Sequence, residues 1–166
     1  MALRRHAAKG LLLPGLLVLC WSSVAAAERL YVNTYGSDWG LWVRGHCLLG
    51  TRDGIAVLEL EEVALEPNRG YPQALEVAGF RLAVAYLDAG LDAGSGAARR
   101  EWEALGPEVA HAVALAPGEV EIVSGVVLDL PPLRPPGAGE VRLLLLQVVM
   151  ASGTPFPVEV ARVRGG

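Results

Sequence analysis

Apolar residues recur at every second position through most of this chain after residue 28. The segment "GIAVLELEEVALE" (54–66) shows the pattern well, with Leu58 and Leu60 on one face and Glu59 and Glu61 on the other. A period of two is typical of a strand that packs one face on a core and turns the other to solvent. The pattern therefore favours sheets over helices for most of the chain.

The alternation in segment 54–66 changes phase once. After Glu61 and Glu62, Val63 and Leu65 continue the apolar side. A one-residue slip moves every following side chain to the other face unless an extra residue bulges out of the strand. We therefore predict a β-bulge at Glu61–Glu62.

About eight short strands, with turn signals every 8–12 residues, indicate an all-β, antiparallel β-sandwich of immunoglobulin-like or jelly-roll-like type. The predicted strands are 29–33, 41–49, 54–66, 79–88, 109–115, 120–130, 140–151 and 156–163. Leu143 to Leu146 lack polar alternation, which predicts a strand covered on both faces. One short helix is expected near residues 97–105. The proline-rich stretch 131–139 is expected to be a stiff connector, and its single "PLRP" match offers the alternative of a docking peptide.

The N-terminus has the features of an export signal. Arg4, Arg5 and Lys9 precede the apolar run "LLLPGLLVLCW", and "VAAAE" supplies small residues for cleavage before Glu28. We predict that residues 1–27 are removed and that 28–166 form a single domain. The expected location is periplasmic or extracellular. A retained anchor and lipidation of Cys20, as in an outer-membrane lipoprotein, are the less favoured alternatives.

Segment 28–166 is acidic. It contains all 18 acidic residues against 11 arginines, so its formal net charge is −7, and Lys9 is the only lysine of the chain. Nucleic acids and anionic membranes are bound by clustered cations, so neither is an expected partner. After residue 28 no apolar run has the length of a membrane-spanning helix. The sequence does not define an oligomeric state.

The sequence "LWVRGHCLLG" (41–50) places a histidine next to a cysteine. Neighbouring side chains of a strand point to opposite faces, so we expect Cys47 in the core and His46 on the mixed outer face. A metal site of Cys47, His111 and Met150 is the alternative. Such a set has the ligand types of a copper site, without their usual close spacing in the sequence. No cofactor is expected.

The signals for catalysis are weak. Ser124 lacks the G-x-S-x-G context of a nucleophile elbow. Glu59 and Glu61 would lie about 7 Å apart on one strand face, a spacing compatible with a glycosidase pair. Charged side chains alternating along a sandwich strand are more simply a solvated face. We therefore predict that the protein is not an enzyme, with a hydrolase as one alternative.

Aromatic residues concentrate near the start of segment 28–166. Tyr31, Tyr35, Trp39 and Trp42 are four of its nine aromatic residues. Such clusters can stack on sugar rings or anchor a protein partner, and they can also simply cap a core.

The predicted recognition residues are Tyr35, Trp39, Trp42, Arg44 and His46. We thus predict an exported, non-catalytic binding or accessory module for another envelope protein or a glycan. The alternatives are a metal-handling protein that uses Cys47 and His111 and a structural subunit of an envelope assembly.

Overall fold

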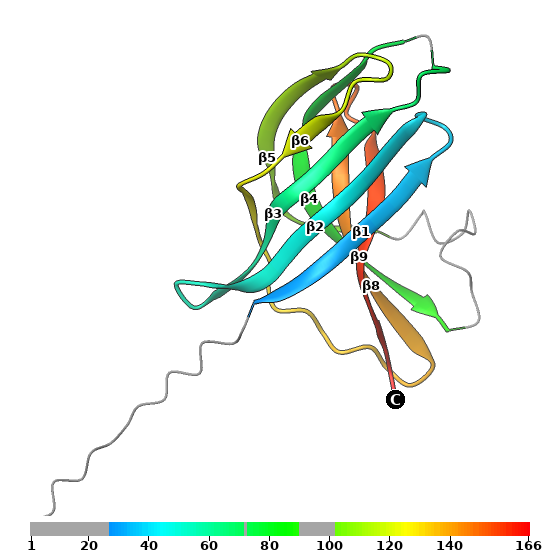
Figure 1. Ribbon diagram of the computed structural model, residues 1–166. Coiled ribbons are helices and arrows are strands. Elements are labelled where there is room, and N and C mark those ends of the chain that lie inside the picture. Colours follow the sequence, from blue (N-terminus) through cyan, green and yellow to red (C-terminus); the bar gives the residue numbers. More distant parts are fainter. Residues whose placement is uncertain (1–26, 72, 90–101) are drawn as a thin grey trace, which may run out of the picture.

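The computed structural model describes residues 27–71, 73–89 and 102–166, and these residues fold into β-strands without a helix. Figure 1 shows two layers of strands facing each other. The strands are β1 (Glu28–Gly36), β2 (Leu41–Arg52), β3 (Ile55–Pro67), β4 (Leu75–Asp88), β5 (Glu103–Leu115), β6 (Glu121–Val123), β7 (Val126–Asp129), β8 (Glu140–Met150) and β9 (Pro155–Arg164).

Two antiparallel sheets form the layers, which confirms the predicted sandwich. Sheet A has the order β1-β2-β3, and both β6 and β7 pair with the far side of β3. Sheet B has the order β5-β4-β8-β9. A two-residue turn at Asp53 and Gly54 joins β2 to β3, and both residues have positive φ (53° and 79°). Asp-Gly is a preferred pair for such hairpins, since these turns match the strand twist.

The core lies between the inner faces of the two sheets. In sheet A, an inward row crosses β1, β2, β3 and β7 and consists of Leu30, Cys47, Leu60 and Val126. Cys47 and Leu60 have no exposed surface. In sheet B, Phe80 and its neighbours on β4 face the same core. The inward parity predicted for Leu58, Leu60 and Cys47 is confirmed.

Strand β8 is buried on both faces, as its run of leucines predicted. Leu144 and Leu146 belong to the central core. Leu143 and Leu145 instead pack with Ala83, Ala85 and Leu87 on the outer side of sheet B, where Trp102 also contacts them. Alternation is absent here because neither face of this strand meets solvent.

The bulge predicted from the phase change is present. His46 pairs with Glu62 and Cys47 pairs with Leu60, so Glu61 is the extra residue of β3. Beside it, Gly45 has a φ of 146°, and a Cβ at this position would collide with the carbonyl oxygen of Glu62. Glycine is therefore required where β2 approaches the bulged strand.

Two expectations were wrong in detail. The short helix predicted near residues 97–105 is contradicted at its end, because 103–105 begin β5, where Leu105 pairs with Leu82 and becomes buried. Residues 97–101 lie outside the described part of the chain. The strand predicted over 120–130 is split at Ser124 and Gly125, since Gly125 adopts a positive φ of 72°.

Candidate functional site

The outer face of sheet A collects most of the predicted recognition residues. Across β1 and β2, Tyr35 lies opposite Trp42, Asn33 opposite Arg44, and Tyr31 opposite His46. Residues directly opposite on one face of a sheet are in side-chain contact range. Alternate side chains of β1 and β2, which are joined by a short turn, therefore gather on the same outer face.

Trp42 is the centre of this face. Its indole Nε1 donates a hydrogen bond to Asn33 Oδ1 at 2.5 Å. The Tyr35 ring meets the indole edge-on, with 5.9 Å between centroids, and the Arg44 guanidinium lies 5.6 Å from the Trp42 centroid. The aromatic side chains are thus held in fixed orientations and still reach solvent: Trp42 is 40% exposed and Tyr35 is 46% exposed.

Charged groups on this face are paired across strands. Arg44 Nη2 contacts Glu66 Oε2 at 2.8 Å, and Arg29 Nε contacts Glu61 Oε2 at 2.6 Å. Both pairs are solvent-exposed, so they add little stability. They leave the aromatic rings among charges that largely cancel.

His46 lies at the other end of the same face. Its imidazole is 5.2 Å from the ring of Tyr31, which is 59% exposed. Tyr31 thus lies on the same outer face as four of the predicted recognition residues, although it was not among the five selected from the sequence. Its position two residues before Asn33 and four before Tyr35 on one strand was the signal that could have placed it there.

Trp39 lies off the strand face that carries the other four predicted recognition residues, although it lines a pocket with Tyr35. It lies in the turn between β1 and β2, is half-buried, and packs against the central core. Its backbone N–H donates to the Gly36 carbonyl. A residue in a turn has no strand parity, so the sequence could not tell which way its ring would point.

A groove of about 580 Å³ opens beside Trp42, at the end of sheet A. Its lining residues come from β1, β2, the end of β3 and two loops: Tyr35, Trp42, Glu66, Pro67, Asn68, Arg69 and Gly118. Asn68 Nδ2 donates to the Tyr35 hydroxyl at 3.1 Å, which fixes that ring. The sequence analysis missed Asn68 and Arg69, because they follow a strand in a loop without any motif.

The three candidate metal ligands occupy different environments. Cys47 is fully buried in the sheet A row of the core, and burial raises its thiol pKa to about 12. His111, on β5, lies 5.8 Å from the Phe80 ring between centroids. Met150 is buried at the end of β8. Within 27–71, 73–89 and 102–166, no three His, Cys, Asp or Glu side chains gather as metal ligands would.

The groups considered for hydrolysis are also dispersed. Ser124 is exposed in the short link between β6 and β7. Glu59 lies 3.7 Å from the Arg52 guanidinium, whereas Glu61 is the bulged residue paired with Arg29. The bulge at Glu61 interrupts the regular spacing from which a carboxylate pair was considered.

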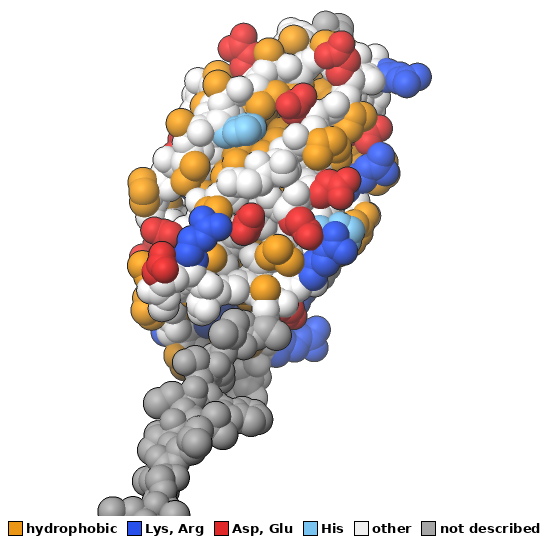
Figure 2. Space-filling view, turned by 60° about the vertical axis from the view of Figure 1, so that its left-hand side comes forward, with side chains coloured by type: hydrophobic (Ala, Val, Ile, Leu, Met, Phe, Trp, Pro, Cys, Tyr) orange, Lys and Arg blue, Asp and Glu red, His pale blue; other side chains and the backbone are white. Residues whose placement is uncertain are grey.

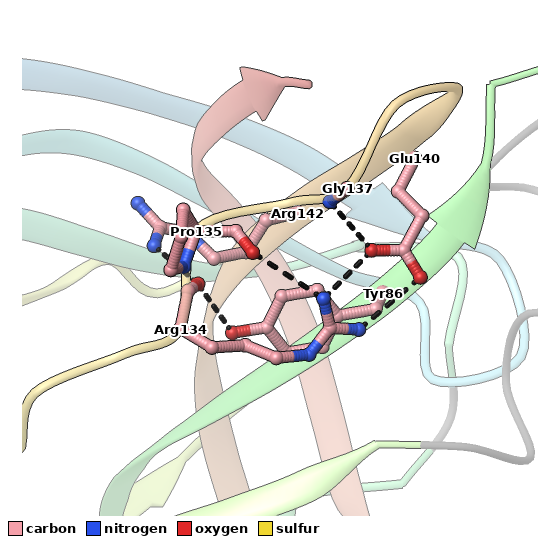
Figure 3. A network of polar contacts seen from close by, with 6 residues as sticks. All are labelled: Tyr86, Arg134, Pro135, Gly137, Glu140 and Arg142. Atoms are coloured by element: carbon pink, nitrogen blue, oxygen red, sulfur yellow. Dashed lines mark hydrogen bonds and ion pairs between the residues drawn. The ribbon is translucent and has the colours of Figure 1, made fainter. Parts of the chain in front are cut away.

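A second polar cluster attaches the proline-rich connector to sheet B (Figure 3). The Arg134 guanidinium lies 3.6 Å from the centroid of the Tyr86 ring and donates to both carboxylate oxygens of Glu140, at 2.7 and 3.2 Å. The Arg134 carbonyl in turn accepts from the Tyr86 hydroxyl and from Arg142. These contacts join the connector to its own sheet, as expected of a structural linker.

Ionic contacts in this cluster hold Glu140 in its charged form. Hydrogen bonds from Arg134 and from the Gly137 backbone N–H lower the pKa of the Glu140 carboxyl from 4.5 to about 2. The same carboxylate raises the pKa of the Arg134 guanidinium. Both shifts follow from stabilisation of the charged partners.

Charges elsewhere on the surface are mixed. On the side of the molecule that carries β5 and β6, Figure 2 shows basic side chains scattered singly among acidic ones, with hydrophobic side chains between them. Among the described residues, no helix has the length and apolar character needed to cross a membrane.

Comparisons with known proteins found no match to this chain among family models, curated proteins or solved structures.

Proposed function

We propose that the protein is an exported, non-catalytic binding or accessory module that recognises another exported protein or a glycan through the outer face of sheet A. The observation that carries the proposal is the exposure of three aromatic side chains, Tyr31, Tyr35 and Trp42, on one sheet face. Large exposed aromatic groups gathered in one place mark interaction surfaces, and Trp, Tyr and Arg dominate binding hot spots.

The orientation of these side chains supports the proposal. Asn33 fixes the indole of Trp42, and Asn68 fixes the hydroxyl of Tyr35. A partner that docks here would lose little of its binding free energy to ordering the side chains it contacts.

The non-catalytic part of the proposal is supported by the placement of the reactive groups. The Cys47 thiol, with its pKa raised to about 12, is buried and supplies almost no thiolate at neutral pH. The imidazoles of His46 and His111 each contact an aromatic ring, Tyr31 and Phe80 respectively.

The export part is supported by the N-terminal sequence and by the position of β1. The first strand begins at Glu28, the residue that would follow the predicted cleavage point. Removal of residues 1–27 would therefore leave every described strand whole.

Site-specific photo-crosslinking in the exporting cell tests the proposal. A photoreactive phenylalanine analogue replaces Tyr31 or Ile122; the latter is on β6, opposite Ala64, on the same outer face and 50% exposed. The control position is Val163 on β9 of sheet B, 41% exposed. We expect one adduct, protein or glycan, from both sheet A positions, with none from Val163.

The substitution Trp42→Ala, added to each crosslinking variant, should remove that adduct. Equal adducts from all three positions, an adduct that survives Trp42→Ala, or no adduct from sheet A would each contradict the proposed function. Thermal melting of the Trp42→Ala protein verifies that the exposed substitution leaves the fold intact.

A further inference from the structure

The groove beside Trp42 has the size and the wall of a small-ligand site. Its volume of about 580 Å³ falls inside the range of roughly 300–1,000 Å³ that is usual for ligand pockets. Trp42 and Tyr35 both line it, with their ring planes inclined by 60° to each other. Two fixed aromatic rings offer flat, weakly negative faces to the C–H groups of a ligand ring.

The polar groups of the groove have hydrogen-bonding capacity to spare. Asn68 uses one amide N–H on Tyr35 and its carbonyl oxygen on the Gly70 N–H, which leaves its second N–H. The hydroxyl of Tyr35 accepts that bond and keeps its own proton to donate. A ligand rich in hydroxyl oxygens would satisfy these donors.

One cation in the groove has no side-chain partner among the described residues. Among the arginines that the structure describes, only Arg69 and Arg164 form no side-chain hydrogen bond or ion pair, and only Arg69 lines the groove. Its aliphatic stem lies against Gly118, where a Cβ would meet Arg69 Cγ at 2.6 Å. The stem is thereby positioned by a glycine turn (φ 79°), and the guanidinium stays available.

The charge of the groove is positive although the protein is acidic. Glu66, the one acid among the described lining residues, is paired with Arg44 at 2.8 Å, so it does not cancel the charge of Arg69. Guanidinium groups match carboxylates in geometry and bind them with charge-assisted hydrogen bonds. The groove thus combines aromatic rings, hydrogen-bond donors that are free to bind a ligand, and the positive charge of Arg69.

We propose that this groove binds a carboxylated sugar ring, which stacks on Trp42 and Tyr35 and pairs its carboxylate with Arg69. The inference rests on the proposed function and specifies the ligand class of that recognition surface. A purely apolar ligand would leave Arg69 and the amide of Asn68 unused. A peptide with an acidic side chain would pair with Arg69 but would not stack a ring on Trp42 and Tyr35.

Calorimetric titration of the purified exported protein tests the proposal with three probes. These are trigalacturonic acid, the same trisaccharide with its carboxyl groups methyl-esterified, and triglutamate, which carries similar charge without sugar rings. We expect the acid to bind at least about tenfold more tightly than the ester or the peptide, the loss that follows from removing one charge-assisted hydrogen bond or the stacking wall.

Three variants assign the contacts. Arg69→Gln should weaken binding of the acid about tenfold and leave the ester unchanged, whereas Trp42→Ala should weaken both. Arg164→Gln is the matched control, because Arg164 is exposed at the end of β9, has no side-chain partner among the described residues and does not line the groove. It should bind like the unmodified protein. Melting curves verify that each variant is folded.

Equal binding of acid and ester, equal binding of triglutamate, an unchanged Arg69→Gln variant, or no binding of any probe would each overturn the inference. The crosslinking experiment separates this failure from that of the proposed function. If the Trp42-dependent adduct forms and the acid does not bind, the recognition surface stands and the ligand class is wrong.

Discussion

At the scale of single residues, strand parity decides what Cys47 and His46 can do. The two side chains are adjacent in the sequence, yet Cys47 lies in the core row between Leu30 and Leu60, and His46 lies beside Tyr31 on the outer face. Sequence alternation alone predicted this separation. The burial of the thiol has a chemical consequence that can be measured.

We expect Cys47 to resist alkylation in the folded protein. Burial raises its pKa from 9.0 to about 12, so at pH 8 the thiolate is scarce and inaccessible. Modification should then require opening of the core, and the rate with iodoacetamide should be at least about a thousandfold slower than in denaturant. Peptide mapping by mass spectrometry follows Cys47 separately from Cys20. Comparable rates in the folded and denatured protein would show that the thiol is accessible.

Residue-level prediction was weakest in loops. The position of His46 on the outer face was predicted correctly because it follows from strand alternation, which also places Trp42 and Arg44 there. Trp39 and Arg69 lie in connections, where side-chain direction depends on tertiary contacts. Arg69 reaches the groove by lying against Gly118, which is about fifty residues away in the sequence and is brought close only when the sheets have formed.

At the scale of elements, the strands themselves were predictable because each has its own alternation. The phase change at Glu61 was visible in the sequence, and it became a bulge because Val63 and Leu65 must return to the core. The helix predicted near 97–105 was wrong at its end, because there the local sequence pattern and the tertiary structure disagree. The local composition of "RREWEAL" suits a helix, but pairing with β4 buries Leu105 and overrides local propensity.

The connector between β7 and β8 should contribute pH-dependent stability through Glu140. Its pKa is lowered in the folded state, so its ion pair with Arg134 stabilises the protein above about pH 4.5. This contribution is lost as the pH falls towards 2. Glu140→Gln should therefore lower the melting temperature at pH 7 and make little difference at pH 2.

Melting curves between pH 2 and pH 8 measure this dependence. Glu121→Gln is the control, since the Glu121 side chain is exposed and forms no hydrogen bond or ion pair with the other described residues. Its melting temperature should follow that of the unmodified protein throughout. A difference between Glu140→Gln and the unmodified protein that persists unchanged at pH 2 would refute the assigned pKa.

At the scale of the whole molecule, two sheets share one core, and their pairing order could not be read from the sequence. Period-two alternation tells which side chains point inwards but not which strand lies next to which. The groove beside Trp42 depends on that order, because it joins the end of β3 to the loop before β6. The shared face of Tyr35, Trp42, Arg44 and His46 within one hairpin was therefore predictable, whereas the groove was not.

The whole fold should tolerate removal of residues 1–27 and fail with a slightly longer deletion. A protein that starts at Glu28 keeps every strand that the structure describes, so its unfolding midpoint in denaturant should equal that of the full chain. A protein that starts at Thr34 loses Leu30 and the fully buried Val32, together with most of the β1–β2 pairing. Burial of two such side chains contributes about 3 kcal/mol or more, a large part of the stability of a small domain. Equal midpoints for both truncations would show that β1 contributes little to the fold, and a lower midpoint for the first would place residues before Glu28 within it.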